Sequence, residues 1–266
     1  MSDQTKLSDL RICVRGGGDI ASGVCWRLNR CGFRVLITEI SQPMAVRRTV
    51  SFCEAVYDGR AGVQGVEAVR IDRADQAPAI WETGGIPLLV DSSCESRSII
   101  RPHVIVDAIL AKRNLGTTID DAPLVMALGP GFEVGTDARY VVETNRGHNL
   151  GRLLTEGAAQ PNTGVPGPVR GITVDRVLRA PADGPWKTAR EIGDRVEAGD
   201  IVGAVSGTPV NILRGLIRPD IAVTTGLKIG DIDPRGDRMY CETISEKALA
   251  IAGGVLEGIL REYMKG

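Results

Sequence analysis

A run of three glycines, Gly16–Gly18, joins two segments of opposite character near the start of the chain. The residues before it, ICVR, are apolar enough for a buried strand, and the residues after it, DIASGVCWRL, repeat apolar side chains at helical spacing. A strand that turns through glycines directly into a helix is the first half of a βαβ unit. The run therefore predicts an α/β protein with a parallel sheet.

Short apolar runs alternate with amphipathic segments from this turn as far as Gly131. The segment between the first two runs, residues 20–31, has helical spacing and stops at Gly32, a residue type common just beyond helix ends. Such alternation is typical of βαβ units, so we predict a Rossmann-like parallel sheet domain over residues 1–131. The expected strands are RICVRG, RVLITEI, IPLLVD, HVIVDAIL and PLVMALG.

The character of the sequence changes after Gly131, where glycines, prolines and short extended pieces replace the helical patterns. We assign residues 132–169 to a connecting region and residues 170–240 to a smaller β-rich domain with a barrel-sandwich-like form. Alternating apolar side chains predict short strands in this domain. The alternating residues are Val196, Ile201, Val205 and Val210.

The last residues, 241–266, predict a helix that packs on the body of the protein. Thr243 and Glu246 have the spacing of a capping box at its start. Gly253 and Gly254 weaken the helix by roughly 1 kcal/mol each relative to alanine, a cost that close packing would offset. The apolar stripe expected to be buried consists of Leu249, Ala252, Leu256, Ile259, Leu260 and Tyr263.

The charge and composition of the chain exclude several classes of binding partner from our expectations. The formal net charge is −1 and the pI is about 6.2, so neither nucleic acid nor an anionic membrane is an expected partner. No apolar run is long enough for a membrane helix and the first residues are polar, so we expect a cytoplasmic protein. Six cysteines without a CxxC pair and two distant histidines argue against a metal site.

The glycine turn matches G-x-G-x-x-A, with a strand before it and a helix after it, and so predicts nucleotide binding. Gly16 permits the tight turn, Gly18 lets a pyrophosphate approach the backbone, and Ala21 lets the helix pack closely on the strand. Gly17 completes the turn. Glu39, about 20 residues further on, is placed to bind ribose hydroxyls.

Two observations leave room for other interpretations of this turn. A glycine-rich strand-to-helix turn can serve packing alone. Asp19 at the helix start favours the helix dipole but competes with a phosphate for the same N–H groups, which weakens a conventional NAD interpretation.

Four candidate residues lie at or just after predicted strand ends, where open α/β sheets bind ligands. Cys94 follows IPLLVD, and its thiolate could carry sulfur or selenium; a buried, inert thiol is the alternative. Asp107 could bind a polar ligand edge or form an ion pair. Gly129 and Gly131 could expose backbone N–H groups to a pocket.

The remaining candidates lie in loops. Arg47 could contact a phosphate, or simply occupy an exposed helix face. Arg146 and Asn162 suit recognition of an anionic pterin phosphate or nucleotide. His148 could act as a general acid or base, or only satisfy backbone carbonyls.

Several longer motifs together resemble the YqeB-type accessory proteins of selenium-dependent molybdenum hydroxylases. This resemblance implies a maturation factor that binds the dinucleotide form of the molybdenum cofactor and delivers or modifies it for a hydroxylase partner. The Rossmann-like part also resembles XdhC-type chaperones of that cofactor. The motifs are VRGGGDIASGVCWRLNRCGFRVLITEI, AVRRTVSFCEAVYDG, VDAILAKRNLG, LGPGF, RGHNLGR, PNTGVPG and KIGDIDPRG.

Two other functions remain open at this point. One is an NAD-dependent oxidoreductase, and the other is a non-catalytic scaffold for the hydroxylase. Self-association is compatible with each of the three.

Overall fold

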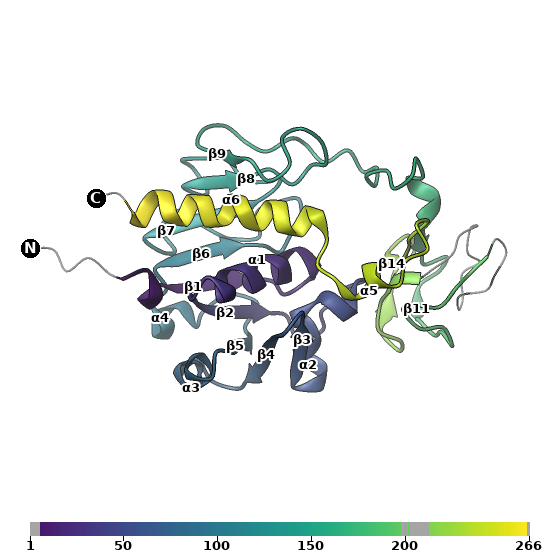
Figure 1. Ribbon diagram of the computed structural model, residues 1–266, viewed down its shortest axis with the longest axis horizontal. Coiled ribbons are helices and arrows are strands. Elements are labelled where there is room, and N and C mark those ends of the chain that lie inside the picture. The colour runs from purple at the N-terminus through teal and green to yellow at the C-terminus, as the bar shows by residue number, and fades with distance from the viewer. Residues whose placement is uncertain (1–5, 198–199, 201, 203–212, 265–266) are drawn as a thin grey trace, which may run out of the picture. The chain divides into compact units, whose positions relative to one another are not determined.

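The computed structural model describes residues 6–197, 200, 202 and 213–264 (Figure 1). Contacts divide the chain into two units, which we describe separately. Unit 1 comprises residues 1–43, 52–162 and 244–266, and unit 2 comprises residues 44–51 and 163–243. Both termini therefore belong to unit 1. None of the helices described is long and apolar enough to cross a membrane.

Unit 1 is built on a nine-stranded sheet in the order β3-β4-β5-β2-β1-β6-β7-β8-β9 (Figure 1). The strands from β4 to β8 are parallel to their neighbours, and β3 and β9 run antiparallel at the two edges. The predicted α/β class with a parallel sheet is thus confirmed. The strands are β1 Arg11–Arg15, β2 Arg34–Glu39, β3 Arg60–Val63, β4 Val66–Ile71, β5 Ile86–Val90, β6 Val104–Asp107, β7 Leu124–Leu128, β8 Tyr140–Val142 and β9 Leu153–Leu154.

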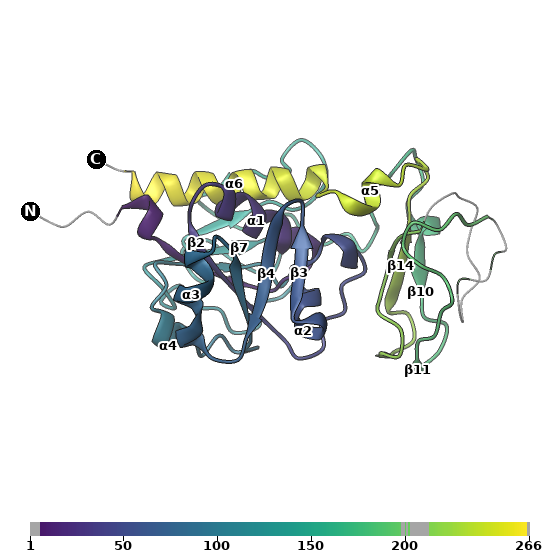
Figure 2. The ribbon, with the colours of Figure 1, turned by 60° about the horizontal axis from the view of Figure 1, so that its bottom comes forward.

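Helices cover both faces of this sheet (Figure 2). The two long helices, α1 (Asp19–Arg30) and α6 (Glu246–Tyr263), lie side by side on one face, α1 over β1 and β2 and α6 over β7, β8 and β9. Short helices cover part of the other face, over a core cluster that includes Cys13, Leu36 and Ile105. These are η4 Ala74–Gln76, α3 Ala77–Glu82 and α4 Arg97–Ile100; η1 Leu7–Asp9, η3 Phe52–Glu54 and α2 Ala55–Asp58 complete the unit.

The strand order reverses beside β1. After β1 the chain proceeds to β2, β4 and β5 on one side and then crosses to β6 on the other. Arg15, the last residue of β1, is in register with Thr38 of β2 and Asp107 of β6. Because the loops after β1 and β6 leave in opposite directions, this is the point at which open α/β sheets bind ligands.

The five predicted apolar runs form β1, β2, β5, β6 and β7. Helix α1 ends at Arg30, and Gly32 has the positive φ of +85° expected just beyond a helix. The regular alternation with helices does not continue, however, because residues 108–123 between β6 and β7 form no helix. The edge strands β3 and β9 and the strands β4 and β8 were not predicted.

Helix α6 begins differently from the prediction. Its N-cap is Ser245, whose side chain accepts a hydrogen bond from the Ala248 N–H at 3.2 Å, so the predicted Thr243–Glu246 capping box is wrong. The hydroxyl of Thr243 instead donates to the carbonyl of Met239. The N-cap serine satisfies one of the unpaired N–H groups of the helix start, two residues further along the chain than predicted.

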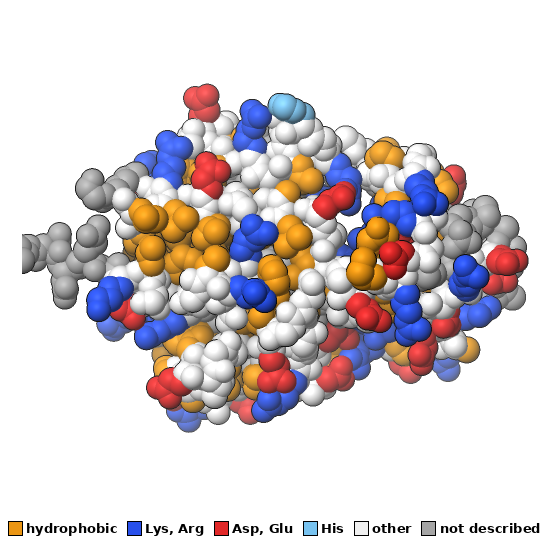
Figure 3. Space-filling view, in the orientation of Figure 1, with side chains coloured by type: hydrophobic (Ala, Val, Ile, Leu, Met, Phe, Trp, Pro, Cys, Tyr) orange, Lys and Arg blue, Asp and Glu red, His pale blue; other side chains and the backbone are white. Residues whose placement is uncertain are grey.

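The buried face of α6 is rotated from the predicted stripe, although Ala252 and Ile259 of that stripe are buried as predicted. Leu249, Leu256 and Leu260 are only half-buried, and Figure 3 shows hydrophobic side chains exposed over this helix. Small residues face the sheet instead, which lets the helix backbone approach it closely. The buried residues of α6 are Ala248, Ile251, Ala252, Gly254, Val255, Gly258 and Ile259.

The described residues of unit 2 form two small antiparallel sheets, in the orders β10-β14-β12 and β11-β13. Its core is centred on Trp186, with Val196 among the buried residues. Three of the residues predicted to alternate here, Ile201, Val205 and Val210, lie outside the described residues. The elements are η2 Arg48–Val50, η5 Val174–Arg176, β10 Val177–Arg179, β11 Gly184–Pro185, β12 Leu213–Leu216, β13 Ala222–Val223, β14 Lys228–Ile232 and α5 Met239–Glu242.

Candidate functional site

The glycine turn leads from β1 into α1 and presents one open side. Gly16 has φ +96°, and a Cβ there would come within 3.1 Å of the Ala108 carbonyl oxygen. A Cβ on Gly17 would touch the backbone of Cys53 at 3.0 Å. Gly18, the N-cap of α1, would meet no atom within 4 Å. The first two glycines are thus required by the fold, whereas the third leaves free space at the helix start.

Glu39 fixes the turn from the end of β2. Its two carboxylate oxygens accept hydrogen bonds from the Gly17 N–H at 2.9 Å and the Ile40 N–H at 2.6 Å. Burial raises the pKa of Glu39, and the two N–H donors oppose that shift. The predicted ribose contact is untested, but the carboxylate has lone pairs left for a ligand hydroxyl.

Cys53 packs against the other side of the turn. Its N–H donates to the Gly17 carbonyl at 2.9 Å, and its side chain is buried. Burial raises the pKa of Cys53 well above the ordinary value, and the carboxylates of Glu39, Glu54 and Asp19 raise it further. Cys53 therefore stays a protonated thiol at neutral pH and supports the turn by packing.

Asp107 neutralises a buried arginine beneath the turn. Its side chain lies 3.5 Å from the guanidinium of Arg15 and accepts a hydrogen bond from the Thr117 hydroxyl at 2.5 Å. Arg15 also donates to the Thr117 hydroxyl oxygen and to the Ser92 carbonyl. Both charged residues are at least 95% buried. This arrangement ties the ends of β1 and β6 together.

Gly129 and Gly131 hold the end of β7 against two neighbouring segments. Both have positive φ, and the N–H of Gly129 donates to the carbonyl of Val142 at 2.9 Å. A Cβ on Gly129 would collide with the Thr144 hydroxyl, and one on Gly131 would come within 2.5 Å of the Arg113 Cα. Each glycine is therefore explained by close packing, against the Thr144 side chain for Gly129 and against the Arg113 backbone for Gly131, whatever its role toward a ligand.

The loop after β8 contains Arg146 and His148. Asn162 is the last residue of the segment 52–162 of unit 1. Glu143 is buried at the start of the loop and accepts hydrogen bonds from the N–H groups of Asn145 and Gln160. Arg146 is half-buried and ion-paired with Glu246 in the first turn of α6. His148 and Asn162 are exposed.

Lys247, in the first turn of α6, is a further charged residue of this region. It was not among the site residues predicted from the sequence. Burial lowers its pKa, and the positive charges of Arg146 and Lys112 lower it further, while Asp19 and Glu143 oppose the shift. The charge of Lys247 is therefore affected by charged residues from other segments of the chain, including Asp19 in the first turn of α1. No sequence pattern links Lys247 to the glycine turn, because only the packing of α6 on α1 brings them together.

Cys94 lies in the turn after β5. It is 2% exposed, has φ +56°, and its Sγ is 3.4 Å from the Sγ of Cys13. Cys13 was not predicted as a neighbour of Cys94, because the two residues are 81 positions apart in the sequence.

Arg47 belongs to unit 2 rather than to the glycine-turn unit. It is buried, and its guanidinium donates to the carbonyls of Tyr240 and Thr243, both at 2.9 Å. In this position it stabilises the segment around α5.

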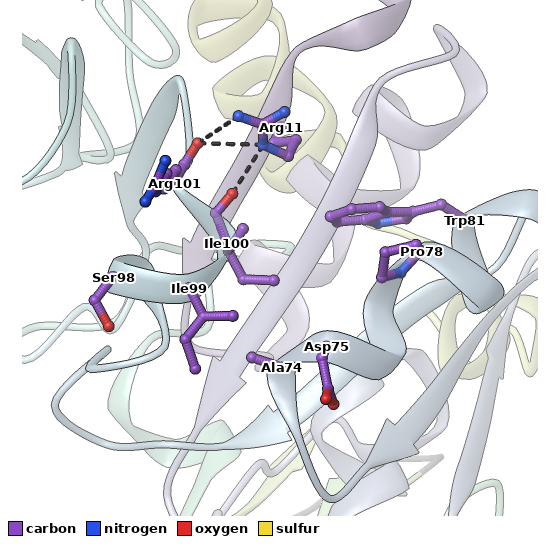
Figure 4. Close-up of a pocket in the computed structure, with 9 residues that line it drawn as sticks. All are labelled: Arg11, Ala74, Asp75, Pro78, Trp81, Ser98, Ile99, Ile100 and Arg101. Carbon is purple, nitrogen blue, oxygen red and sulfur yellow. Dashed lines mark hydrogen bonds between the residues drawn. The ribbon is translucent and has the colours of Figure 1, made fainter.

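A concave region of unit 1 lies at the opposite, amino-terminal edge of the strands (Figure 4). It has a volume of about 530 Å³, and Trp81 and Ile99 contribute apolar surface to it. The guanidinium of Arg11 donates to the carbonyls of Ile100 and Arg101 beside it. The strand order and the glycine turn favour the carboxyl edge of the strands as the principal binding site. The cavity in Figure 4 serves as the site against which binding at the glycine turn can be compared.

The chain is 46% identical over 260 residues to the uncharacterized protein YqeB of Escherichia coli (strain K12), an alignment that includes 96% of the chain. The chain spans about half the length of this relative, 48%. No protein-family model matches the chain, and no solved structure matches it. The chain is thus a homologue of YqeB over almost all its own residues, and the name of that relative assigns no activity.

Proposed function

Taking the homology to YqeB as the premise, we propose that this chain is a cytoplasmic maturation factor for a selenium-dependent molybdenum hydroxylase. Its cargo is a nucleotide-containing molecule, the dinucleotide form of the molybdenum cofactor. Unit 1 binds the diphosphate of this cargo at the glycine turn and hands the cargo on to the hydroxylase. The observation that carries the proposal is the open side of Gly18 at the start of α1.

The backbone supports a diphosphate at this position. Gly18 precedes a helix of 12 residues, whose first N–H groups carry partial positive charge. Glu39 and Cys53 hold Gly17 from two sides, so the turn is rigid before a ligand arrives. A rigid turn lowers the ordering cost of binding.

The nearby side chains support an anion as well. Three side chains supply positive charge, and two carboxylates limit the net positive charge. The cationic side chains are those of Lys112, Arg146 and Lys247, and the carboxylates are those of Asp19 and Glu143. A half-buried lysine of lowered pKa gains most from an anionic partner, because the partner restores the charge balance that burial disturbs. A phosphate beside Lys247 therefore raises the pKa of its amine.

An NAD-dependent oxidoreductase is the second candidate, and the position of Glu39 at the end of β2 favours it. Two backbone N–H groups already occupy the Glu39 carboxylate, so a ribose would have to share it. We therefore place this candidate second.

The proposal predicts that Gly18→Asp weakens binding of molybdopterin dinucleotide at least about 10- to 100-fold, or about 1.4 to 2.8 kcal/mol. The new carboxylate occupies the phosphate space and repels the anion. The fold should persist, because Gly18 has φ −67° and ψ 179° and aspartate is a favoured N-cap residue. Calorimetry with NADH, ATP and molybdopterin dinucleotide measures the effect.

Gly62→Asp is the matched control, since Gly62 lies in edge strand β3 with no atom within 4 Å of its Cβ position. It should bind every ligand as the wild type does. Loss of NADH binding alone in Gly18→Asp would favour the oxidoreductase. Unchanged binding of all three ligands would remove the site assignment, and hydroxylase capture by Gly18→Asp without nucleotide would favour a scaffold.

A further inference from the structure

Two thiols meet in the core of unit 1 although their residues are far apart in sequence. Cys13 lies in the middle of β1, and Cys94 lies in the turn that follows β5. Their sulfur atoms are 3.4 Å apart, and neither residue is more than 2% exposed. The separation is larger than the roughly 2.05 Å of a disulfide, so the two side chains are reduced and in contact.

The backbone holds Cys94 toward Cys13 in an uncommon conformation. Its φ of +56° is rare for a residue with a side chain. Asp91 maintains this turn, because its carboxylate accepts hydrogen bonds from the N–H groups of Glu95 and Ser96 at 3.0 and 2.8 Å. Such local strain is often found at functional positions.

The surroundings distinguish the two sulfur atoms chemically. The hydrogen bond between the two sulfur atoms lowers the pKa of Cys94, and the guanidinium of Arg15 lowers it further, while burial and Asp91 oppose this shift. The pKa of Cys13 is raised well above the ordinary value by the same hydrogen bond and by burial. Arg15 has a buried Nε without a hydrogen-bond partner among the described residues. Arg15 also donates a hydrogen bond to the Ser92 carbonyl in the turn of Cys94, so its positive charge lies on that side of the pair and favours Cys94 as the nucleophile.

Cys94 belongs to a turn at the surface of unit 1. Its neighbours Ser93 and Glu95 are exposed, so the sulfur lies just beneath a surface turn. A molecule as small as hydrogen peroxide can reach it when this turn opens, whereas a protein thiol reaches it less readily.

We propose that Cys13 and Cys94 form an oxidant-reactive dithiol site whose co-reactant is a small peroxide. The Cys94 thiolate attacks one peroxide oxygen, the O–O bond breaks, and after protonation Cys94 sulfenic acid and one water result. The sulfur of Cys13 then attacks the Cys94 sulfur and its proton passes to the departing hydroxyl. A disulfide and a second water form, so two thiols are oxidised and one peroxide is reduced. This site is independent of nucleotide binding.

The test is disulfide mapping of the folded wild-type protein after treatment with one equivalent of hydrogen peroxide. After alkylation and trypsin digestion, the peptide of residues 12–15 should appear linked to the peptide of residues 74–97, with the loss of two hydrogens. The linkage should form at least about tenfold faster than oxidation of Cys25, a lone buried thiol whose pKa burial raises. The rate should rise with pH toward the lowered pKa of Cys94.

Serine variants of the two cysteines distinguish a reactive role of each thiol from a purely structural one. Cys13→Ser should trap Cys94 as a sulfenic acid that reacts with dimedone, and Cys94→Ser should give neither the disulfide nor the adduct. Denatured wild type should lose the selective linkage. Oxidation of Cys94 no faster than that of Cys25, or a linkage equally abundant in the denatured chain, would overturn the proposal.

Discussion

Replacing Asp107 with alanine is expected to lower the free energy of unfolding of unit 1 by about 3–5 kcal/mol. The variant leaves the positive charge of Arg15 buried without its carboxylate and leaves the Thr117 hydroxyl without its acceptor. Hydrogen exchange of amides in β1 and β6 measures this energy, because central strands exchange through global opening.

Glu67→Ala is the control for this prediction. Glu67 forms an ion pair with Arg60 at 2.7 Å, which is shorter than the 3.5 Å between Arg15 and Asp107. The side chains of Arg60 and Glu67 are, however, each at least half exposed. Its removal should cost no more than about 1 kcal/mol. Burial rather than distance therefore determines the difference, and equal costs for the two variants would contradict the role given to Asp107. The double variant Arg15→Met/Asp107→Leu should recover much of the loss.

Two neighbouring glycines of α6 should respond to alanine with opposite signs. A Cβ on Gly253 meets nothing within 4 Å, so Gly253→Ala should raise the free energy of unfolding by up to about 1 kcal/mol through helix propensity. A Cβ on Gly254 would overlap the Gly151 carbonyl and approach Val142 Cγ1 at 2.9 Å. Gly254→Ala should therefore lower it by about 1–3 kcal/mol, the usual cost of overpacking.

The same hydrogen-exchange measurement, applied to α6 and β8, tests this pair of variants. Each carries the same chemical change one residue apart, so helix propensity cancels in the comparison. If both alanine variants were equally stable, α6 would not pack on residues 142–151 as closely as described.

The sequence predicted the central part of unit 1 because its strands are buried on both faces. Continuous apolar runs identify such strands, and the glycine turn identified the first crossover. Strands β3 and β4 were missed because they are half-exposed and contain few consecutive apolar residues, as in RAGV. The buried face of α6 was misjudged because hydrophobicity favoured leucines, whereas close approach to the sheet required glycine and alanine.

The candidate site was predictable only where it is local. The turn of Gly16–Gly18 and the placement of Glu39 follow from short motifs. Lys247 and Cys13 did not, because their neighbours come from distant parts of the chain and are brought close by α6 and by the strand order. The position of Arg47 in unit 2 could not be predicted from the sequence either. Residues 44–51 belong to a unit that is formed mainly by residues 163–243.

The most direct test of the central claim is a titration of ¹⁵N-labelled protein with molybdopterin dinucleotide, followed by backbone amide shifts. The account predicts saturable shifts at Gly17, Gly18 and Ile20, at the start of α1, and little change around the cavity of Figure 4. Shifts confined to that cavity, at Arg101 and the Trp81 indole, with the glycine-turn amides unmoved, would contradict it.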